Sequence, residues 1–274
     1  MAKDLLHSMR SLMRHPAFTA VAVITLMLAI GVNTTIFSVV NAVLLKALPF
    51  RDPQQLVSVE RAPTEDGLPG IAAYQYLAWK DRNTTFDDLA AFTDNNFNLT
   101  GIGEPERISC AQVTSSLFTT LGVKPVRGRF FVAEEDKPGA SNVAIVSEAF
   151  WLRRFGRDES ILQKTLTLDN KPYLIVGVMP NNFRYPGEFD VWLPLALDPV
   201  KEFQGDWFQL VDVAGRLKPN ATLAGAQTEL NLIAKQASDQ GKAEPLPFAA
   251  VDVAPLHKQL VAGIRVTVFV LWGA

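Results

Sequence analysis

The stretch that decides the fold lies near the start of the chain, at residues 17–45, and its sequence is AFTAVAVITLMLAIGVNTTIFSVVNAVLL. None of these residues carries a charge. A helix needs about 20 apolar residues to cross the hydrocarbon core of a bilayer, so the run is long enough to span a membrane and to continue beyond it. We therefore expect one transmembrane helix with a short stalk over residues 17–48.

A cleaved signal peptide is the alternative interpretation of this stretch. Lys3, Arg10 and Arg14 would form its basic start, and residues 40–42 would be a weak cleavage site. The uncharged run, however, greatly exceeds the roughly 7 to 15 residues of a signal-peptide core, which favours a retained span. The same three basic residues place the N-terminus in the cytoplasm and the residues after the span on the far side of the membrane.

Residues 1–16 precede the span and form a cytoplasmic amphipathic segment in our prediction. Leu5, Met9 and Leu12 recur at helical spacing, with basic residues elsewhere around the helix and Pro16 at its end. Such a helix lies along the membrane surface or simply extends the spanning helix, and the sequence favours neither.

Four small or polar residues of the span share one helical face. Gly31, Thr34, Ser38 and Asn41 are spaced i, i+3, i+7 and i+10. Small residues let helices approach closely in lipid, and Ser, Thr and Asn side chains form hydrogen bonds across such contacts. The pattern predicts a neighbouring helix packed on this face. The alternative is that the hydroxyls bond their own backbone carbonyls and that Asn41 lies at the membrane interface.

The end of the sequence is apolar again. Residues 261–274 include only Arg265 and Thr267 as polar side chains. We interpret the segment as the start of a second transmembrane helix, cut off by the end of the sequence, because it is shorter than a full span. Valines alternate with other residues from position 266 to 271, so a buried terminal strand is the alternative.

Charge is distributed unevenly along the chain of 274 residues. Residues 1–50 carry four basic side chains and one acid, which gives about +3, so the rest of the chain carries about −5 of the net −2. A net negative chain lacks the basic face that phosphate binding needs, which argues against a nucleic acid partner. The single cysteine excludes a scaffold held together by internal disulfides.

The large region between the apolar ends has the pattern of a water-exposed α+β domain. Short alternating apolar runs predict strands at 56–61, 107–113, 142–146, 165–168, 173–179, 189–193 and 208–217. Helical spacing predicts helices at 71–82, 115–121, 147–155 and 223–238. The four residues Asp169-Asn170-Lys171-Pro172 lie between two strand-like runs and predict a hairpin turn. We expect a first part at 49–122, an inserted strand-rich subdomain at 123–200 and a second part at 201–260.

Chemical motifs are largely missing from the sequence. It has no phosphate-binding loop for ATP, no zinc-protease motif and no nucleophile elbow. Gly101-Ile102-Gly103 lacks the third glycine of a dinucleotide loop. The chain is therefore not expected to be an enzyme, and we assign no catalytic, cofactor-binding or metal-binding residue.

Two charged clusters are candidate binding sites. The acidic residues 134–136 lack the alternating oxygen ligands of a calcium loop, so a solvated turn is the favoured interpretation. Arg153, Arg154 and Arg157 resemble a phosphate or lipid-headgroup site, but surface ion pairs are favoured. The expected partners are Asp158, Glu159 and Glu148.

The order of several sequence blocks resembles the membrane subunits of MacB-type and FtsX-type ABC transporters, in their duplicated orphan permease branch. The blocks are AIGVNTTIFSVVNAVLL at 29–45 with LPF at 48–50, LGVKPVRGRFF at 121–131, WLRRFG at 151–156 and YLIVGVMP at 173–180. Each block is short, and the specificity comes from their order over nearly the whole chain.

The resemblance implies a bacterial inner-membrane permease with a periplasmic domain held between the first and second of four spanning helices. It implies a separate cytoplasmic ABC ATPase subunit, a second permease copy or duplicated half, membrane lipid and a periplasmic adaptor as partners. Members of this group convert closure of the ATPase into movement of the outside domain. The later helices are absent from these 274 residues, which puts independent transport activity in doubt.

The leading hypothesis is thus a permease fragment whose external domain moves in efflux or envelope transport. A membrane-anchored periplasmic sensor or ligand-binding module is the alternative, and it predicts a concave pocket with converging polar groups. A third hypothesis, an anchored envelope enzyme, requires an acid, base or nucleophile cluster that the spacing does not reveal.

Overall fold

The computed structural model of the chain describes residues 16–40, 49–63, 70–204, 209–239 and 250–260. The chain forms two compact units. One holds residues 49–259 and the other holds the helix that precedes them. Each unit is described by itself. The predicted segments at 1–15, 41–48 and 261–274 lie outside the described residues.

The first unit contains helix α2, Pro16–Val40, which coincides with most of the uncharged run. Large apolar side chains along it are exposed, with Phe18 at 72% and Met27 at 67%. The hydroxyls of Thr25 and Thr34 donate to the carbonyls of Val21 and Ile30, four residues back, which satisfies these polar groups inside the helix. None of the helices in the described residues combines the length and the apolar character that crossing a membrane requires.

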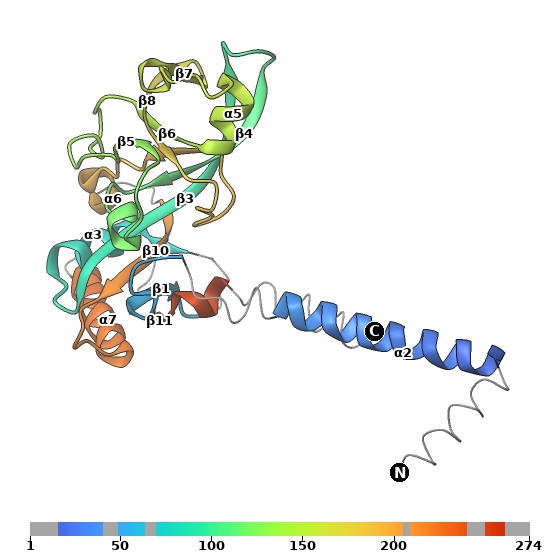
Figure 1. Ribbon diagram of the computed structural model, residues 1–274. Helices are drawn as coiled ribbons and strands as arrows, with labels where there is room; N and C mark the ends of the chain where they lie inside the picture. Colours follow the sequence, from blue (N-terminus) through green and yellow to red (C-terminus); the bar gives the residue numbers. More distant parts are fainter. Residues whose placement is uncertain (1–15, 41–48, 64–69, 205–208, 240–249, 261–274) are drawn as a thin grey trace. The chain divides into compact units, whose positions relative to one another are not determined.

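The second unit is built on one mixed sheet of 11 strands in the described residues (Figure 1). Along the sheet the strands follow the order β11-β1-β10-β3-β4-β9-β6-β8-β5, with β2 beside β10 and with β7 beside β3 and β8. Their bounds are β1 Leu56–Arg61, β2 Ile71–Ala72, β3 Phe86–Thr100, β4 Glu106–Val113, β5 Arg127–Gly128, β6 Val143–Ser147, β7 Thr165–Leu168, β8 Lys171–Met179, β9 Val191–Pro194, β10 Leu210–Leu217 and β11 Val251–Pro255. Neighbouring strands are antiparallel except in the pairs β4 with β9 and β6 with β8.

Short helices and turns connect these strands. The bounds are α3 Ala73–Arg82, α4 Leu117–Leu121, α5 Glu148–Phe155, α6 Pro199–Gln204 and α7 Leu223–Asp239, with 3-10 turns η2 Pro53–Gln55 and η3 Ile161–Gln163. The start of α5 is fixed by Ser147, whose hydroxyl accepts the amide of Phe150 at 3.0 Å.

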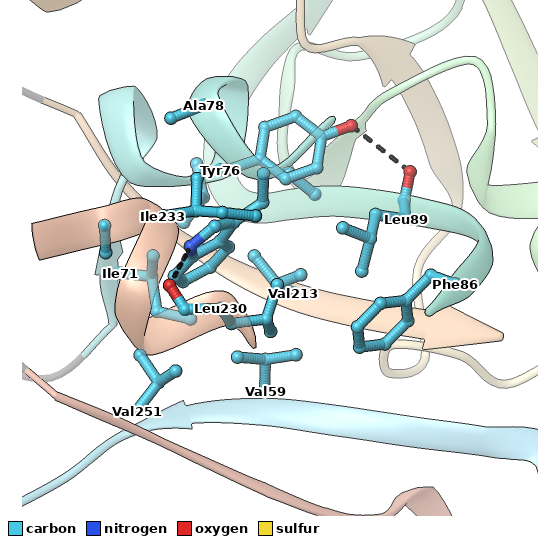
Figure 2. Packing of buried hydrophobic residues seen from close by; sticks show 14 of the residues in the cluster. Val59, Ile71, Tyr76, Ala78, Phe86, Leu89, Val213, Leu230, Ile233 and Val251 are labelled. Carbon is cyan, nitrogen blue, oxygen red and sulfur yellow. Dashed lines mark hydrogen bonds between the residues drawn. The ribbon is translucent and has the colours of Figure 1, made fainter. Parts of the chain in front are cut away.

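Two apolar clusters share this sheet. One lies between α3, α7 and the strands β1, β10 and β11, and Figure 2 shows its side chains converging from both helices and the sheet. The hydroxyl of Tyr76 donates to the carbonyl of Leu89 at its edge. The other cluster packs α5 against β4, β6, β7, β8 and β9. Strand β3 contributes Phe86 to the first cluster and Leu99 to the second, so one strand runs through both.

The structure confirms the predicted α+β class and a large part of its elements. All seven predicted strands and all four predicted helices in this unit are present, and β1 and β7 match at both ends. Asp169 and Asn170 have φ values of 45° and 63° between paired β7 and β8, which confirms a hairpin turn, but the turn is shorter than predicted because Lys171 and Pro172 already belong to β8. Strands β2, β3, β5 and β11 and helix α6 were not predicted. The division into parts at residues 122/123 and 200/201 stays a prediction.

Candidate functional site

In the acidic turn at 134–136, the carboxylates of Glu135 and Asp136 bind other parts of the same unit. Both carboxylate oxygens of Glu135 accept from the guanidinium of Arg129, at 2.6 and 2.8 Å. Hydrogen bonding to Arg129 holds the pKa of Glu135 below its usual value. The carboxylate of Asp136 accepts the amides of Ser115 at 2.7 Å and Ala196 at 2.9 Å. Burial raises the pKa of Asp136. The predicted solvated turn is thus more ordered than expected. In the described part of the chain, no group of three potential ligands could hold a metal ion.

The arginines after Trp151 form ion pairs, as the favoured interpretation predicts. Arg157 pairs with Glu148, which was among the predicted partners. Arg153 pairs with Asp190 at 2.6 Å, and Arg154 pairs with Glu106, two partners that differ from the predicted Asp158 and Glu159. Most of these contacts are at least partly exposed, so each contributes little to stability.

The four residues predicted to pack against a neighbouring helix are only partly described. A Cβ added to Gly31 would meet no atom within 4 Å. The hydroxyl of Thr34 bonds its own helix. The side chain of Ser38 and all of Asn41 lie outside the described residues. The packing face therefore stays a prediction.

The most constrained polar site in the second unit is the place where the chain enters it. We call residues 49–55 the entry segment. Asp52 is in the left-handed region with φ 42°, and the 3-10 turn η2 follows and ends where β1 begins at Leu56. The amide of Gln55 donates to the carbonyl of Asp52 at 3.0 Å. The entry segment is therefore folded compactly before it reaches the sheet.

The side chain of Arg216 in β10 forms hydrogen bonds to the entry segment. The side chain is 2% exposed, and its Nη2 donates to the carbonyl of Arg51 at 2.7 Å. Nη1 reaches the carbonyl of Asp52 at 3.3 Å and the amide oxygen of Gln55 at 3.5 Å. Nε donates to the carbonyl of Thr120 in α4 at 2.8 Å. One guanidinium thus joins β10, the entry segment and α4.

The chemistry of this contact is unusual because the buried cation is bound by neutral acceptors. Its hydrogen bonds in the described chain go to three backbone carbonyls and one side-chain amide. Burial, followed by the nearby charge of Arg51, lowers the pKa of Arg216. Taking a charge out of water is costly, and the cost is tolerated only where several well-placed acceptors replace the lost hydration. The site is built to fix positions rather than to carry out chemistry.

Helix α4 closes the other side of the entry segment. The amide of Arg51 donates to the carbonyl of Leu121 at 3.3 Å. Gly122 ends α4 in the left-handed conformation with φ 69°, and a Cβ there would lie 2.6 Å from the Cβ of Arg51. Only glycine fits this contact without displacing the entry segment.

Aromatic rings support the start of the entry segment. The ring of Phe50 lies 6.4 Å from that of Phe183 and 6.0 Å from that of Tyr185, in edge-on arrangements. Tyr185 in turn contacts Phe92 of β3 at 5.4 Å. A pocket of about 210 Å³ beside these rings is lined by Pro49, Phe50, Gly122, Val123, Lys124, Pro180, Asn182 and Phe183.

The entry segment is therefore bound to β10 and α4 of the same unit and continues directly into β1. A sequence family model described as the MacB-like periplasmic core domain matches residues 19–233, most of the chain. The chain belongs to this family. The match confirms the resemblance that the ordered sequence blocks indicate. The family is a component of ABC transporter permeases and implies an ABC ATPase as partner.

Solved structures share the fold of this MacB-like domain. The periplasmic region of MacB from Actinobacillus actinomycetemcomitans is 13% identical, with a TM-score of 0.56 over 78% of this chain and 94% of that one. A domain of a putative permease protein from Porphyromonas gingivalis is 16% identical, with a TM-score of 0.52 over 76% and 92% of the two chains.

The extracellular domain of the noncanonic ABC-type transporter YknZ from Gram-positive bacteria is 15% identical, with a TM-score of 0.50 over 73% of this chain and 99% of that one. No curated protein sequence matches the chain.

Sequence reasoning missed the role of Arg216 in this MacB-like domain. One signal was available, because Arg216 interrupts the apolar pattern of the predicted strand at 208–217. A charged side chain inside such a pattern is either at a strand end or buried with partners. The partners themselves lie far away in the sequence, with Arg51 at a separation of 165 positions.

Proposed function

We propose that this chain is the N-terminal part of the membrane subunit of a MacB/FtsX-type ABC transporter. Residues 17–45 anchor it in the bacterial inner membrane, with the N-terminus in the cytoplasm and the sheet domain in the periplasm. ATP hydrolysis by a separate cytoplasmic ATPase moves this domain in efflux or envelope transport. The task of the chain is mechanical.

The observation that carries the proposal is the construction of the entry segment. It follows the uncharged run within a few residues and is hydrogen-bonded to β10 and α4 at once. A flexible linker would isolate the domain from movements of its anchor. A fixed junction passes them on, which suits a domain that is moved from the membrane.

The pocket beside the entry segment does not favour the sensor alternative. A binding module needs a concave pocket with converging polar groups, and small-molecule pockets occupy about 300 to 1,000 Å³. The pocket beside the entry segment has a volume of about 210 Å³, which is below this range.

The first test is biochemical. The complete gene product is purified with each candidate ATPase, and co-purification with vanadate-sensitive ATP hydrolysis is the expected result. No association and no such hydrolysis in any pairing would contradict the proposal.

The second test measures movement. Cys110 is buried, so a cysteine introduced at the exposed Glu104 position can be labelled selectively in the Glu104→Cys variant. Energy transfer from this label to a dye in the bilayer reports the distance of the domain from the membrane. We expect the transfer to change when ATP is added to the reconstituted complex. Unchanged transfer in an actively hydrolysing complex would overturn the mechanical role.

The helix face belongs to the same proposal. We expect the Gly31, Thr34, Ser38 and Asn41 face to pack against another helix of the permease or of a second copy. Replacing Ser38 and Asn41 with leucine removes the polar groups and adds bulk, so association in a bilayer should weaken. Unchanged association would remove this face from the proposal, as would equal weakening by leucine at Thr25, which lies elsewhere on the helix. The proposed further partners are membrane lipid and a periplasmic adaptor.

A further inference from the structure

The entry segment is a weak point in any mechanical connection. Residues 52–55 form a left-handed residue and a 3-10 turn, with a rise of about 2.0 Å per residue against roughly 3.4 Å for extended chain. Pulled straight, these four residues would lengthen by roughly 6 Å. Among the described residues, only two backbone hydrogen bonds hold this short 3-10 turn, from the amides of Gln55 and Leu56 to the carbonyls of Asp52 and Pro53, so it would yield early under load. Movement of the anchor would then be absorbed before it reached β1.

Arg216 connects the chain upstream of the turn directly to the sheet. Its two Nη groups bind the carbonyls of Arg51 and Asp52, at the upstream end of the turn. Its backbone lies in β10, between β1 and β3, where Arg216 pairs with Leu56 and Asp88. The path from Arg51 to the sheet through the guanidinium therefore omits residues 53–55 altogether.

The same side chain also fixes the neighbouring helix. Nε of Arg216 donates to Thr120, and Leu121 of the same helix accepts the amide of Arg51. These contacts close a ring of three hydrogen-bonded parts, namely β10, α4 and the entry segment. A ring of this kind resists displacement in more directions than a single contact does.

We propose that Arg216 is a mechanical latch that carries movement of the membrane-proximal chain into β10, past the compliant turn at residues 52–55. The inference rests on the proposed function, because it names the residue through which that function reaches the sheet. A purely structural arginine would stabilise the domain without determining where force enters it.

The direct test replaces Arg216 with methionine, which retains an unbranched apolar stem and removes all four hydrogen bonds. Lys218→Met is the matched control, because Lys218 lies just beyond β10 and donates to the single carbonyl of Thr84 at 2.6 Å. Hydrogen exchange on the full chain should show the amides of Arg51 and Gln55 exchanging roughly tenfold faster or more in Arg216→Met, with α7 unchanged. The control should leave both amides as they are. Unchanged exchange in Arg216→Met, or uniformly faster exchange, would overturn the latch.

Movement is then measured in the reconstituted complex with the label at position 104. Arg216→Met should reduce the ATP-dependent change in energy transfer to less than about half of its original size, because local opening absorbs the displacement. Lys218→Met should not. If the unmodified complex shows no change, the proposed function itself fails and the latch falls with it. If Arg216→Met moves as the unmodified complex does, only the latch fails.

A second pair of variants keeps Arg216 and so avoids a folding defect at that site. Three residues, Gly-Ser-Gly, are inserted either between Leu48 and Pro49 or between Gln55 and Leu56, which adds up to about 10 Å of slack. The latch predicts that slack before residue 49 reduces the ATP-dependent change in energy transfer, whereas slack after residue 55 leaves it intact. Equal loss from both insertions would mean that the movement travels along the backbone, and this would overturn the proposal.

Discussion

Gly122 lies against Arg51 so closely that a Cβ atom at position 122 would sit 2.6 Å from the Cβ of Arg51. Real Cβ atoms do not approach each other so closely, so one of the two backbones would have to shift. Arg51 is the residue whose carbonyl Arg216 binds and whose amide Leu121 accepts. The end of α4 therefore determines where the entry segment lies.

The first prediction is that Gly122→Ala destabilises the domain through this contact. A non-glycine residue at positive φ costs about 1 kcal/mol, and overpacking adds roughly 1 to 3 kcal/mol. The free energy of unfolding of the chain in detergent, from urea denaturation, measures the sum.

Gly139→Ala is the matched control for this prediction. Gly139 has φ 78°, close to the 69° of Gly122, but a Cβ there would meet no atom within 4 Å. Both variants therefore carry the conformational cost and only Gly122→Ala carries the contact. We expect Gly122→Ala to be less stable by at least about 1 kcal/mol. Equal losses in the two variants would contradict the contact.

The second prediction concerns Asp136, which joins the start of α4 to the chain after β9. Its two carboxylate oxygens accept the amides of Ser115 and Ala196 separately. In Asp136→Asn one of these oxygens becomes an amide nitrogen that faces an N–H donor. We expect a loss of about 1 to 3 kcal/mol in the free energy of unfolding. The exposed Asp81→Asn serves as control, and a loss no larger than in that variant would be evidence against the bridge.

How far the sequence predicts this fold depends on the element. Helices α5 and α7 follow from apolar periodicity, and the β7–β8 hairpin follows from Asp169-Asn170. Strand β3 does not, because it contains Asp87, Asp94 and Asn95, residue types that are depleted in strands. Its length of 15 residues is determined by pairing with β10, β4 and β7. Such tertiary pairing overrides local propensity.

The candidate site likewise depends on contacts between remote segments, which local sequence does not predict. The ordered blocks at 29–45 and 121–131 are local and indicate the family, which the family match confirms. The junction depends on three segments around residues 51, 120 and 216 that meet only in the folded sheet. Nothing local to Arg216 distinguishes a buried latch from an exposed strand end. The bonds of Asp136 in the acidic turn could not be predicted for the same reason, since its partners Ser115 and Ala196 are remote in the sequence.

The third prediction separates a buried hydrogen bond from buried volume. Trp79 and Trp192 are both 0% exposed. The indole N–H of Trp79 donates to the carbonyl of Leu230 at 2.8 Å, whereas that of Trp192 has no hydrogen-bond partner among the described residues. Trp79→Phe should therefore cost about 0.5 to 1.5 kcal/mol more than Trp192→Phe, because it removes a buried hydrogen bond whereas Trp192→Phe removes none. Circular dichroism during urea unfolding measures both, and equal costs would contradict the role of this bond.

The last prediction is a pH dependence at Glu229 of α7. Its Oε1 accepts the amide of Thr84 at 2.8 Å and the hydroxyl of Thr84 at 2.6 Å. Its Oε2 accepts the amide of Thr85 at 3.1 Å and the hydroxyl of the same residue. Burial raises the pKa of Glu229, but the hydrogen bonds from Thr84 and Thr85 outweigh it and hold the pKa below its ordinary value of 4.5. The carboxylate thus fastens α7 to the turn before β3.

The lowered pKa of Glu229 determines how the free energy of unfolding changes with pH. A carboxyl group with a lowered folded-state pKa binds fewer protons in the folded state than in the unfolded state. It therefore stabilises the fold above pH 4.5, and this contribution is lost as the pH falls through the folded-state pKa.

Glu229→Gln removes the titration and places an amide nitrogen against two donors. The difference in unfolding free energy between the original chain and this variant should be largest near pH 7 and should shrink below about pH 4.5. Glu104→Gln, at an exposed position, is the control. A difference for Glu229→Gln that is constant from pH 7 to pH 4, or that grows as the pH falls, would show that the hydrogen bonds do not favour the ionised carboxylate.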